Sequence, residues 1–421
     1  MSVGSQIKFI RMRRQMTQTE LANGIISVSY LSKIENNQLD PSKEIVNLLF
    51  ERLGLIESIT WDDHLGEDLL QFYDSLLKRD FTKADKLFER ISSHSIFQAG
   101  ESEKIFFKLL SMHYLTLKNE TKKLNELVMH IAPYYETFTL ENKYFFHKYK
   151  GDIHYDQKDF AEALKSYKTS KEFLAQISVN QLEKADFYYG IALCYSRLLN
   201  DDLSIEYGKT SLALFQSTYQ LERCANCHIL LGICYRRQMK YDMALQSFHI
   251  AREVSKTIQY SEIRGTIEHN LGTLKSIIGN VEEAVSHYKL SLHFKKNDSN
   301  LSKIITIHSL VKVYHEDKRI EEAKEWLEKG WELIRPDKEK LHRFYLSFYV
   351  YENILFGYRD DFDSFMKNEV LPFFEKEGDL KQLCIFIGIL ADYYNGAKKY
   401  KSAAYYYSSA NKYYQRLLSL S

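Results

Sequence analysis

A repeat of about 40 residues runs through most of the 421-residue chain and restricts the folds that it can adopt. In one copy, the small residue Gly232 is followed by Tyr235, Ala244 and Phe248, at offsets of 3, 12 and 16 residues. The same order of small and large apolar residues begins near residues 72, 111, 151, 192, 232, 272, 311, 351 and 391. About nine copies at this spacing predict an array in which each unit stacks on its neighbours.

The composition favours helices in these units, because the chain contains only four prolines and 17 glycines. The small residue and the alanine at offset 12 allow two antiparallel helices to approach closely. We interpret the recurring aromatic residues, such as Tyr235 and Phe248, as core residues rather than as a cofactor site. The pattern resembles the tetratricopeptide repeat, although the period is longer than the usual ~34 residues. The resemblance implies an all-α fold with a right-handed superhelical array of about nine tetratricopeptide-like hairpins.

The first 55 residues carry a different pattern, in which short helices alternate with turn signals. Thr17 and Glu20 form a capping box at the start of one helix, and Gly24 interrupts it because glycine tolerates positive φ. Ser27 is placed to cap the next helix. The expected helices span residues 6–15, 18–22, 28–35 and 42–53. Two short helices across a tight turn, between two supporting helices, are typical of a helix-turn-helix.

The sequence Thr-Gln-x-Glu-Leu-Ala, followed by Val-Ser-x-Leu-Ser-Lys-Ile-Glu-Asn, resembles the Cro/C1 (Xre) family of helix-turn-helix proteins. The match extends from Ile7 to Leu55 and implies that the helix beginning at Val28 enters the major groove of DNA. It also implies a structural pair between Arg11 and Glu35. The candidate DNA-binding residues are Gln18, Ser27, Ser29, Tyr30, Lys33, Arg13 and Arg14. The alternative is a helical hairpin that packs on another protein.

We divide the chain into a helix-turn-helix domain, residues 1–60, and a repeat domain for peptide binding and oligomerisation, residues 61–421. In such arrays the first helix of each unit lines a concave surface that binds extended peptides or partner helices. Asparagine suits this surface, because its amide both donates and accepts hydrogen bonds. Counting from the repeat starts gives the candidate peptide-binding residues Asn226, Asn270, Tyr189, Lys148, Arg236 and Lys312. For each of them, the alternative is an ordinary solvated polar side chain.

Other classes of function find less support. The formal net charge is +1, so the DNA prediction depends on the motif and not on a basic field. Cys224, Cys227 and His228 resemble half of a zinc site, but no second pair at a suitable spacing follows. The sequence has no phosphate-binding glycine loop, no nucleophile elbow and no HExxH motif. We therefore expect no enzymatic activity, no metal and no cofactor.

The expected location follows from the N-terminus and the cysteines. The N-terminus lacks the apolar region of a secretion signal, and no apolar run approaches the length of a membrane span. The five cysteines form no dense disulfide framework, which suits reduced thiols. We expect a cytoplasmic protein without membrane contact.

A Cro/C1-type helix-turn-helix followed by tetratricopeptide-like repeats resembles, over the whole chain, the NprR/PlcR-like members of the RRNPP quorum-sensing regulators of Gram-positive bacteria. The resemblance implies a receptor for a short signalling peptide that repositions two DNA-binding heads on a double-stranded operator. A homodimer or higher homo-oligomer is also expected because one recognition helix reads few base pairs. Two alternatives stand beside this reading. One is a Rap-type scaffold that binds a sporulation response regulator, and the other is a repressor that needs no peptide.

Overall fold

The computed structural model describes residues 3–14, 16–36, 38–39, 41–53, 63–95, 101–258 and 263–418, and these contain helices and turns without strands. The chain separates into two compact units. Unit 1 comprises residues 1–198 and 202–220, and unit 2 comprises residues 199–201 and 221–421. The all-α prediction is confirmed. The boundary near residue 60, predicted between the head and the array, lies outside the described residues.

The helix-turn-helix head begins unit 1 and has a small core of its own. Its helices are α1 (Val3–Arg13), α2 (Gln18–Ala22), α3 (Val28–Glu35) and α4 (Lys43–Arg52). Leu21, Leu31, Ile34 and Leu49 are fully buried between them. The predicted caps are present: Thr17 and Glu20 form the capping box, and the Ser27 hydroxyl accepts a hydrogen bond at the start of α3.

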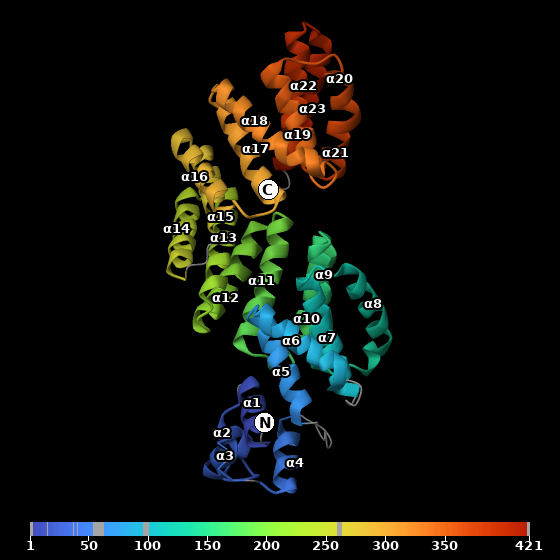
Figure 1. Cartoon of the computed structure of the whole chain (residues 1–421), viewed down its shortest axis with the longest axis vertical. Coiled ribbons are helices and arrows are strands. Elements are labelled where there is room, and N and C mark those ends of the chain that lie inside the picture. The colour runs from blue at the N-terminus through green and yellow to red at the C-terminus, as the bar shows by residue number, and fades with distance from the viewer. Residues whose placement is uncertain are drawn as a thin grey trace. The chain divides into compact units, whose positions relative to one another are not determined.

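Four helical hairpins complete unit 1. They are α5 (Asp63–Leu77) with α6 (Phe81–Arg90), α7 (Glu101–Leu117) with α8 (Thr121–Ile131), α9 (Leu140–Asp156) with α10 (Phe160–Leu174), and α11 (Gln181–Arg197) with α12 (Asp201–Ser217). The short π-helical turn η1 (Ile91–Ser95) follows α6, and the 3-10 turn η3 (Ala132–Thr137) follows α8. Figure 1 shows the hairpins of this unit in blue to green.

Five further hairpins form unit 2. The first three are α13 (Leu221–Arg237) with α14 (Tyr241–Thr257), α15 (Arg264–Ile277) with α16 (Val281–Phe294), and α17 (Asn300–Glu316) with α18 (Ile320–Ile334), which the 3-10 turn η4 (Arg335–Asp337) follows. In the fourth, α19 (His342–Phe356) pairs with a second arm made of α20 (Phe362–Phe365), the π-helical turn η5 (Met366–Val370) and α21 (Leu371–Lys376). The last is α22 (Leu380–Gly396) with α23 (Tyr400–Leu418). The four hairpins of unit 1 and the five hairpins of unit 2 correspond to the nine predicted copies of the sequence repeat.

In several repeats an aromatic ring on the second helix packs against a small residue on the first helix. Phe248 of α14 lies so close to Gly232 of α13 that a Cβ atom there would be 2.5 Å from the ring. Tyr288 stands in the same relation to Gly272, at 2.8 Å. The alanine at offset 12 is fully buried at residues 84, 163, 244, 284 and 323. The predicted roles of the small and aromatic positions are therefore confirmed.

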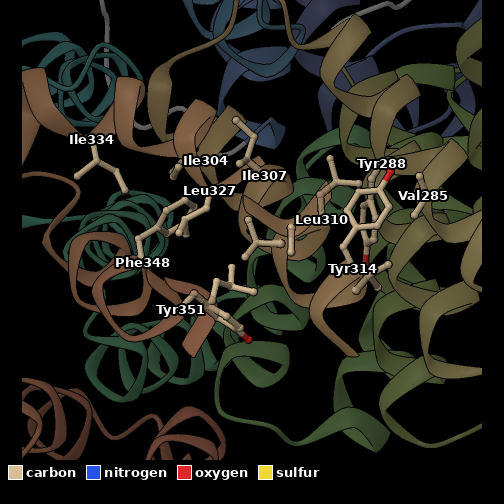
Figure 2. Close-up of a cluster of buried hydrophobic side chains, with 14 of the residues drawn as sticks. Val285, Tyr288, Ile304, Ile307, Leu310, Tyr314, Leu327, Ile334, Phe348 and Tyr351 are labelled. Carbon is tan, nitrogen blue, oxygen red and sulfur yellow. The ribbon is translucent and has the colours of Figure 1, made fainter. Parts of the chain in front are cut away.

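Neighbouring repeats share buried clusters of side chains. In unit 2, Tyr288 of α16, Tyr314 of α17 and Leu327 of α18 belong to a single buried cluster with Phe348 of α19. Figure 2 shows Tyr288 beside Tyr314, and Leu327 beside Phe348. The tyrosines and phenylalanines of the repeat are thus packing residues, as expected from their spacing.

Each hairpin turns through one residue in the left-handed conformation. The residues are Arg79, Asn119, Lys158, Leu199, Met239, Gly279, Lys318, Gly357 and Lys398, with φ between 56° and 105°. Only two of the nine are glycine, although glycine adopts this conformation at the lowest cost. The turns therefore follow the repeat spacing even where the sequence carries no turn residue.

The contact between Gly232 and Phe248 allows a test of the repeat geometry. The substitution Gly232→Ala places a methyl group against a fully buried ring, and such overpacking costs about 1–3 kcal/mol. This cost should exceed the gain of ~1 kcal/mol in helix propensity. We expect a lower unfolding midpoint in urea. Gly388→Ala in α22 is the control, because nothing lies within 4 Å of the added atom, and it should stabilise the protein.

Candidate DNA-binding and ligand-binding surfaces

The exposed face of α3 carries two of the predicted DNA-binding residues. Ser29 and Lys33 are both exposed and lie one helical turn apart on the same side of α3. Tyr30 is half-buried and packs against the core of the head. The Ser27 hydroxyl accepts a hydrogen bond from the Tyr30 backbone N–H at 3.1 Å, so it fixes the start of the helix.

A buried ion pair sets the orientation of α3. The Arg11 guanidinium donates to both carboxylate oxygens of Glu35, at 2.5 and 2.8 Å, which confirms the expected structural pair. The Gln18 side-chain amide donates to the same carboxylate at 2.7 Å. Gln18, predicted to hold the DNA backbone, therefore directs its amide toward Glu35 in this structure. The sequence motif could not distinguish these two directions.

Arg13 and Arg14, at the end of α1, are the two arginines predicted to contact phosphates. The side chain of Arg13 lies outside the described residues. Arg14 faces the repeats of unit 1, because its guanidinium lies 3.7 Å from a carboxylate oxygen of Glu141. Its backbone carbonyl accepts a hydrogen bond from the Ser178 hydroxyl at 3.1 Å. The head thus contacts the array through the end of α1.

The second surface of interest carries the predicted ligand-binding side chains of α13, α15 and α17, which are first helices of hairpins in unit 2. We call it the first-helix face. Asn226 is half-buried on α13. Asn270 on α15 is 7% exposed, and its amide donates to the Thr266 carbonyl at 2.9 Å within the same helix. The Asn270 amide therefore keeps its oxygen and one N–H for a ligand.

The two predicted cations of the first-helix face differ in their ion-pair partners. Lys312 of α17 lies 3.7 Å from Glu316, one turn along the same helix. Arg236 of α13 is half-buried, and burial lowers the pKa of its guanidinium. In the described part of the chain, no carboxylate lies within ion-pair distance of Arg236.

Two histidines on the same face are kept neutral. Burial, together with the positive charges of Lys295 and Arg236, lowers the pKa of His269 to about 3. Burial and the charge of Lys312 lower the pKa of His308 to about 4. His269 also lies 3.2 Å from the Thr306 hydroxyl, which joins α15 to α17. The sequence analysis did not single out these histidines, because their burial depends on helices that are distant in sequence.

The two predicted ligand contacts of unit 1 lie in packed surroundings. Tyr189 is half-buried, with its ring 6.4 Å from that of Phe215. Lys148 is 1% exposed and donates to Glu183 at 2.7 Å, with Asp186 at 3.0 Å. Burial alone would lower the pKa of Lys148, but these carboxylates raise it above its ordinary value. The Lys148 ammonium is thus committed to the interior and does not face a ligand in this structure.

Two tyrosines join the same carboxylate, and we call this group the Glu183 node. Tyr73 of α5 donates to Glu183 at 2.9 Å, and Tyr144 of α9 does so at the same distance. Glu183 is fully buried on α11. The node therefore satisfies a buried charge with three donors from two other helices.

The cysteines do not gather into a metal centre. Cys224, Cys227 and Cys234 are buried free thiols, and burial raises the pKa of the Cys224 thiol. Among the described residues, no group of three or more His, Cys, Asp or Glu side chains is arranged to hold a metal ion. None of the described helices combines the length and the apolar character needed to span a membrane.

Comparisons with known proteins agree with this architecture. Residues 7–57 match the helix-turn-helix family HTH_3. The chain is 35% identical over 406 residues to the transcriptional activator NprA of Geobacillus stearothermophilus. This alignment covers 95% of this chain and 100% of NprA. The structure of NprR in complex with its cognate peptide NprX is similar, with a TM-score of 0.64 and 19% sequence identity. The similarity covers 83% of this chain and 98% of the NprR chain. The structure of a Rap protein complexed with competence and sporulation factor is also similar, with a TM-score of 0.70 and 17% sequence identity. The similarity covers 85% of this chain and 99% of the Rap chain.

The neutral histidines predict how stability depends on pH. The unfolded chain protonates His269 and His308 near their ordinary pKa of 6.5, whereas the folded protein does so only near 3 and 4. The unfolded state binds more protons in this range, so stability should fall as the pH drops from about 6.5 to about 4. Urea unfolding at several pH values measures the slope between pH ~6.5 and ~5, before carboxylates protonate. The double variant His269→Gln/His308→Gln should reduce this slope without abolishing it, because burial also lowers the pKa of His228. The control His130→Gln, at an exposed site, should leave the slope unchanged.

Proposed function

The chain belongs to the RRNPP family, and we propose that it is a transcriptional regulator that binds DNA through its head and a short signalling peptide through its repeats. The observation that carries this proposal is the 35% identity to a transcriptional activator over nearly the whole chain. Two surfaces of the structure support the two parts of this proposal. These are the exposed face of α3 and the first-helix face of unit 2.

For DNA, we assign the direct contacts to Ser29 and Lys33. Their side chains project into solvent from the helix that a helix-turn-helix inserts into the major groove. Ser27 and Tyr30 support this helix. We assign a phosphate contact to the amides at the start of α2 and to Gln18, whose side chain must turn away from Glu35 to make it. Arg13 extends this set at the end of α1. Arg14 joins it only when its contact with Glu141 opens.

For the peptide, we assign the backbone contacts to Asn226 and Asn270 on the first-helix face. Their amides can pair with peptide N–H and C=O groups whatever the peptide sequence. Arg236 and Lys312 supply charge on the same face, and Tyr189 remains a candidate in unit 1. NprR, which shares the fold, is known in complex with its cognate peptide NprX, and a Rap protein of the same fold is known in complex with competence and sporulation factor.

We propose a homodimer or larger homo-oligomer as the active form, because paired heads supply the affinity that one recognition helix lacks. We also propose a cytoplasmic location and no catalytic activity; the five cysteines are free thiols, as expected of a reducing compartment. The alternative of a Rap-type scaffold that binds a response regulator predicts a protein partner and no need for DNA. The two tests below separate these functions.

The assignment of α3 predicts the effect of two substitutions. Ser29→Ala and Lys33→Ala should each weaken binding to the operator without changing the fold, since both side chains are exposed. A good bidentate base contact is worth about 1–3 kcal/mol, and a single hydrogen bond is worth less. Gel-shift titration of promoter DNA from the protein's own gene region measures the change. Lys340→Ala, which removes one exposed charge from unit 2, is the control. Unchanged affinity in both head variants would contradict the assignment.

The peptide assignment predicts that Asn226→Ala and Asn270→Ala weaken peptide binding and leave the DNA affinity of the peptide-free protein unchanged. An unsatisfied peptide amide costs about 1–3 kcal/mol, or roughly ten- to a hundredfold in affinity. Calorimetry with synthetic peptides from a secreted short reading frame beside the gene measures this loss, with circular dichroism to verify folding. Asn125→Ala, at an exposed site on α8, should bind like wild type. If no such peptide binds the wild type, the scaffold alternative replaces the peptide receptor.

A further inference from the structure

A chain of hydrogen bonds joins three helices of unit 2 at His269. The Lys295 ammonium, directly after α16, donates to the Thr306 hydroxyl of α17 at 3.0 Å and to the Ser302 carbonyl at 3.1 Å. The Thr306 hydroxyl in turn lies 3.2 Å from Nδ1 of His269 on α15. Lys295 is 5% exposed and Thr306 is fully buried, so water competes little for these contacts.

The ammonium sets the direction of the hydrogen bond between Thr306 and His269. An ammonium group is only a donor, so the Thr306 oxygen accepts from Lys295 and keeps its own hydrogen to donate. Burial lowers the pKa of Lys295 only to about 8, so this group is charged at neutral pH. A lone pair on Nδ1 is attracted to the nearby positive charge, whereas an N–H at that position would be repelled. The Thr306 hydroxyl therefore donates to Nδ1.

A second acceptor near Thr306 does not change this direction. The Ser291 hydroxyl lies 3.4 Å from the Thr306 hydroxyl, which is a longer and weaker contact than the one to Nδ1. Ser291 donates its own hydrogen to the Gly265 carbonyl at 2.6 Å. The shorter contact with His269 is the better use of the Thr306 hydrogen.

The other ring nitrogen of His269 is an unused donor. The imidazole is neutral, and because Nδ1 accepts, its single N–H is at Nε2. Within the described parts of the chain, Nε2 has no hydrogen-bond partner, and it is not among the polar atoms that are buried without one. It is therefore open to solvent. His308, at the same position of the next repeat, differs because its Nε2 is buried without a partner.

We propose that His269 binds the signalling peptide by donating its Nε2–H to a backbone carbonyl oxygen, and that Lys295 and Thr306 are positioning residues that hold the imidazole in this tautomer. This inference rests on the proposed peptide-receptor function and names a further contact of that site. A neutral N–H suits a neutral acceptor, and an extended peptide offers one carbonyl per residue. Asn270, the next residue on α15, is assigned to the same backbone, so His269 adds a second contact that does not depend on the peptide sequence.

The tautomer is measured without any ligand. Long-range proton–nitrogen correlation spectra of the full chain, labelled with 15N-histidine, distinguish a protonated from an unprotonated ring nitrogen. Loss of signals in His269→Phe assigns the residue. At pH 7 we expect a protonated Nε2 and an unprotonated Nδ1. Lys295→Met removes the buried charge and should raise the share of the Nδ1–H form, whereas Lys340→Met, at an exposed site, should not.

Calorimetry with the synthetic peptide from the short reading frame beside the gene measures the contact itself. His269→Phe keeps an aromatic ring and removes the donor, so the peptide should bind about tenfold more weakly. His293→Phe, at an exposed site on α16 of the same hairpin, should bind like wild type. Lys295→Met should also weaken binding, although Lys295 is too buried to touch the peptide. Circular dichroism verifies that each variant is folded.

A scan of single thioamides along the peptide locates the acceptor, because sulfur accepts a hydrogen bond more weakly than oxygen. One position should cost affinity with wild type and cost less with His269→Phe, which isolates the pair as in a double-mutant cycle.

The failures of the two proposals are distinguishable. If the peptide binds wild type and His269→Phe equally, the peptide receptor stands and the role of His269 is wrong. A protonated Nδ1 in the wild-type spectrum would also overturn it, and so would a thioamide scan in which no position depends on His269. If Lys295→Met keeps the wild-type tautomer, the positioning role of Lys295 is wrong. If the peptide does not bind wild type, the receptor proposal fails and the His269 contact fails with it.

Discussion

The close contact between a small residue on one helix and an aromatic ring on the next determines most of this structure. Phe248 over Gly232 and Tyr288 over Gly272 fix the distance between the helices of a hairpin, and the buried alanine on the second helix makes that distance short. Hairpins of constant thickness stack with a shared core, and their first helices then lie along one surface. The proposed ligand surface is therefore a consequence of packing within the repeats.

The repeat and the head were predictable from the sequence because each depends on contacts at fixed separations. The offset of 16 residues from Gly232 to Phe248 brings the two onto facing helices, and this offset recurs along the chain. Capping of α2 by Thr17 and Glu20 is local in the same sense, and so is the start of α3 at Ser27. Left-handed turns at residues such as Met239 were not predictable, because no turn residue marks them.

Side-chain direction at the candidate sites was harder to predict, because it depends on partners that are distant in sequence. Lys148 occupies an offset that predicted a ligand contact, but Glu183 and Asp186, more than thirty residues away, hold its ammonium inside unit 1. Arg14 meets Glu141 in the same way. Conversely, His269 and His308 are ordinary in the sequence and acquire their low pKa from burial, together with the positive charges that lie near them in the fold.

The Glu183 node also has a consequence for how unit 1 comes apart. In a simple repeat array each hairpin touches only its neighbours, so such an array can unravel from an end, one hairpin at a time. The node joins α5 of the first hairpin to α9 of the third and α11 of the fourth, through Tyr73, Lys148 and Glu183. Opening the first hairpin strips a donor from a buried carboxylate three hairpins away in sequence. Unit 1 should therefore lose its hairpins together, in one cooperative step, and amide hydrogens in α5 and α11 should exchange at matching rates.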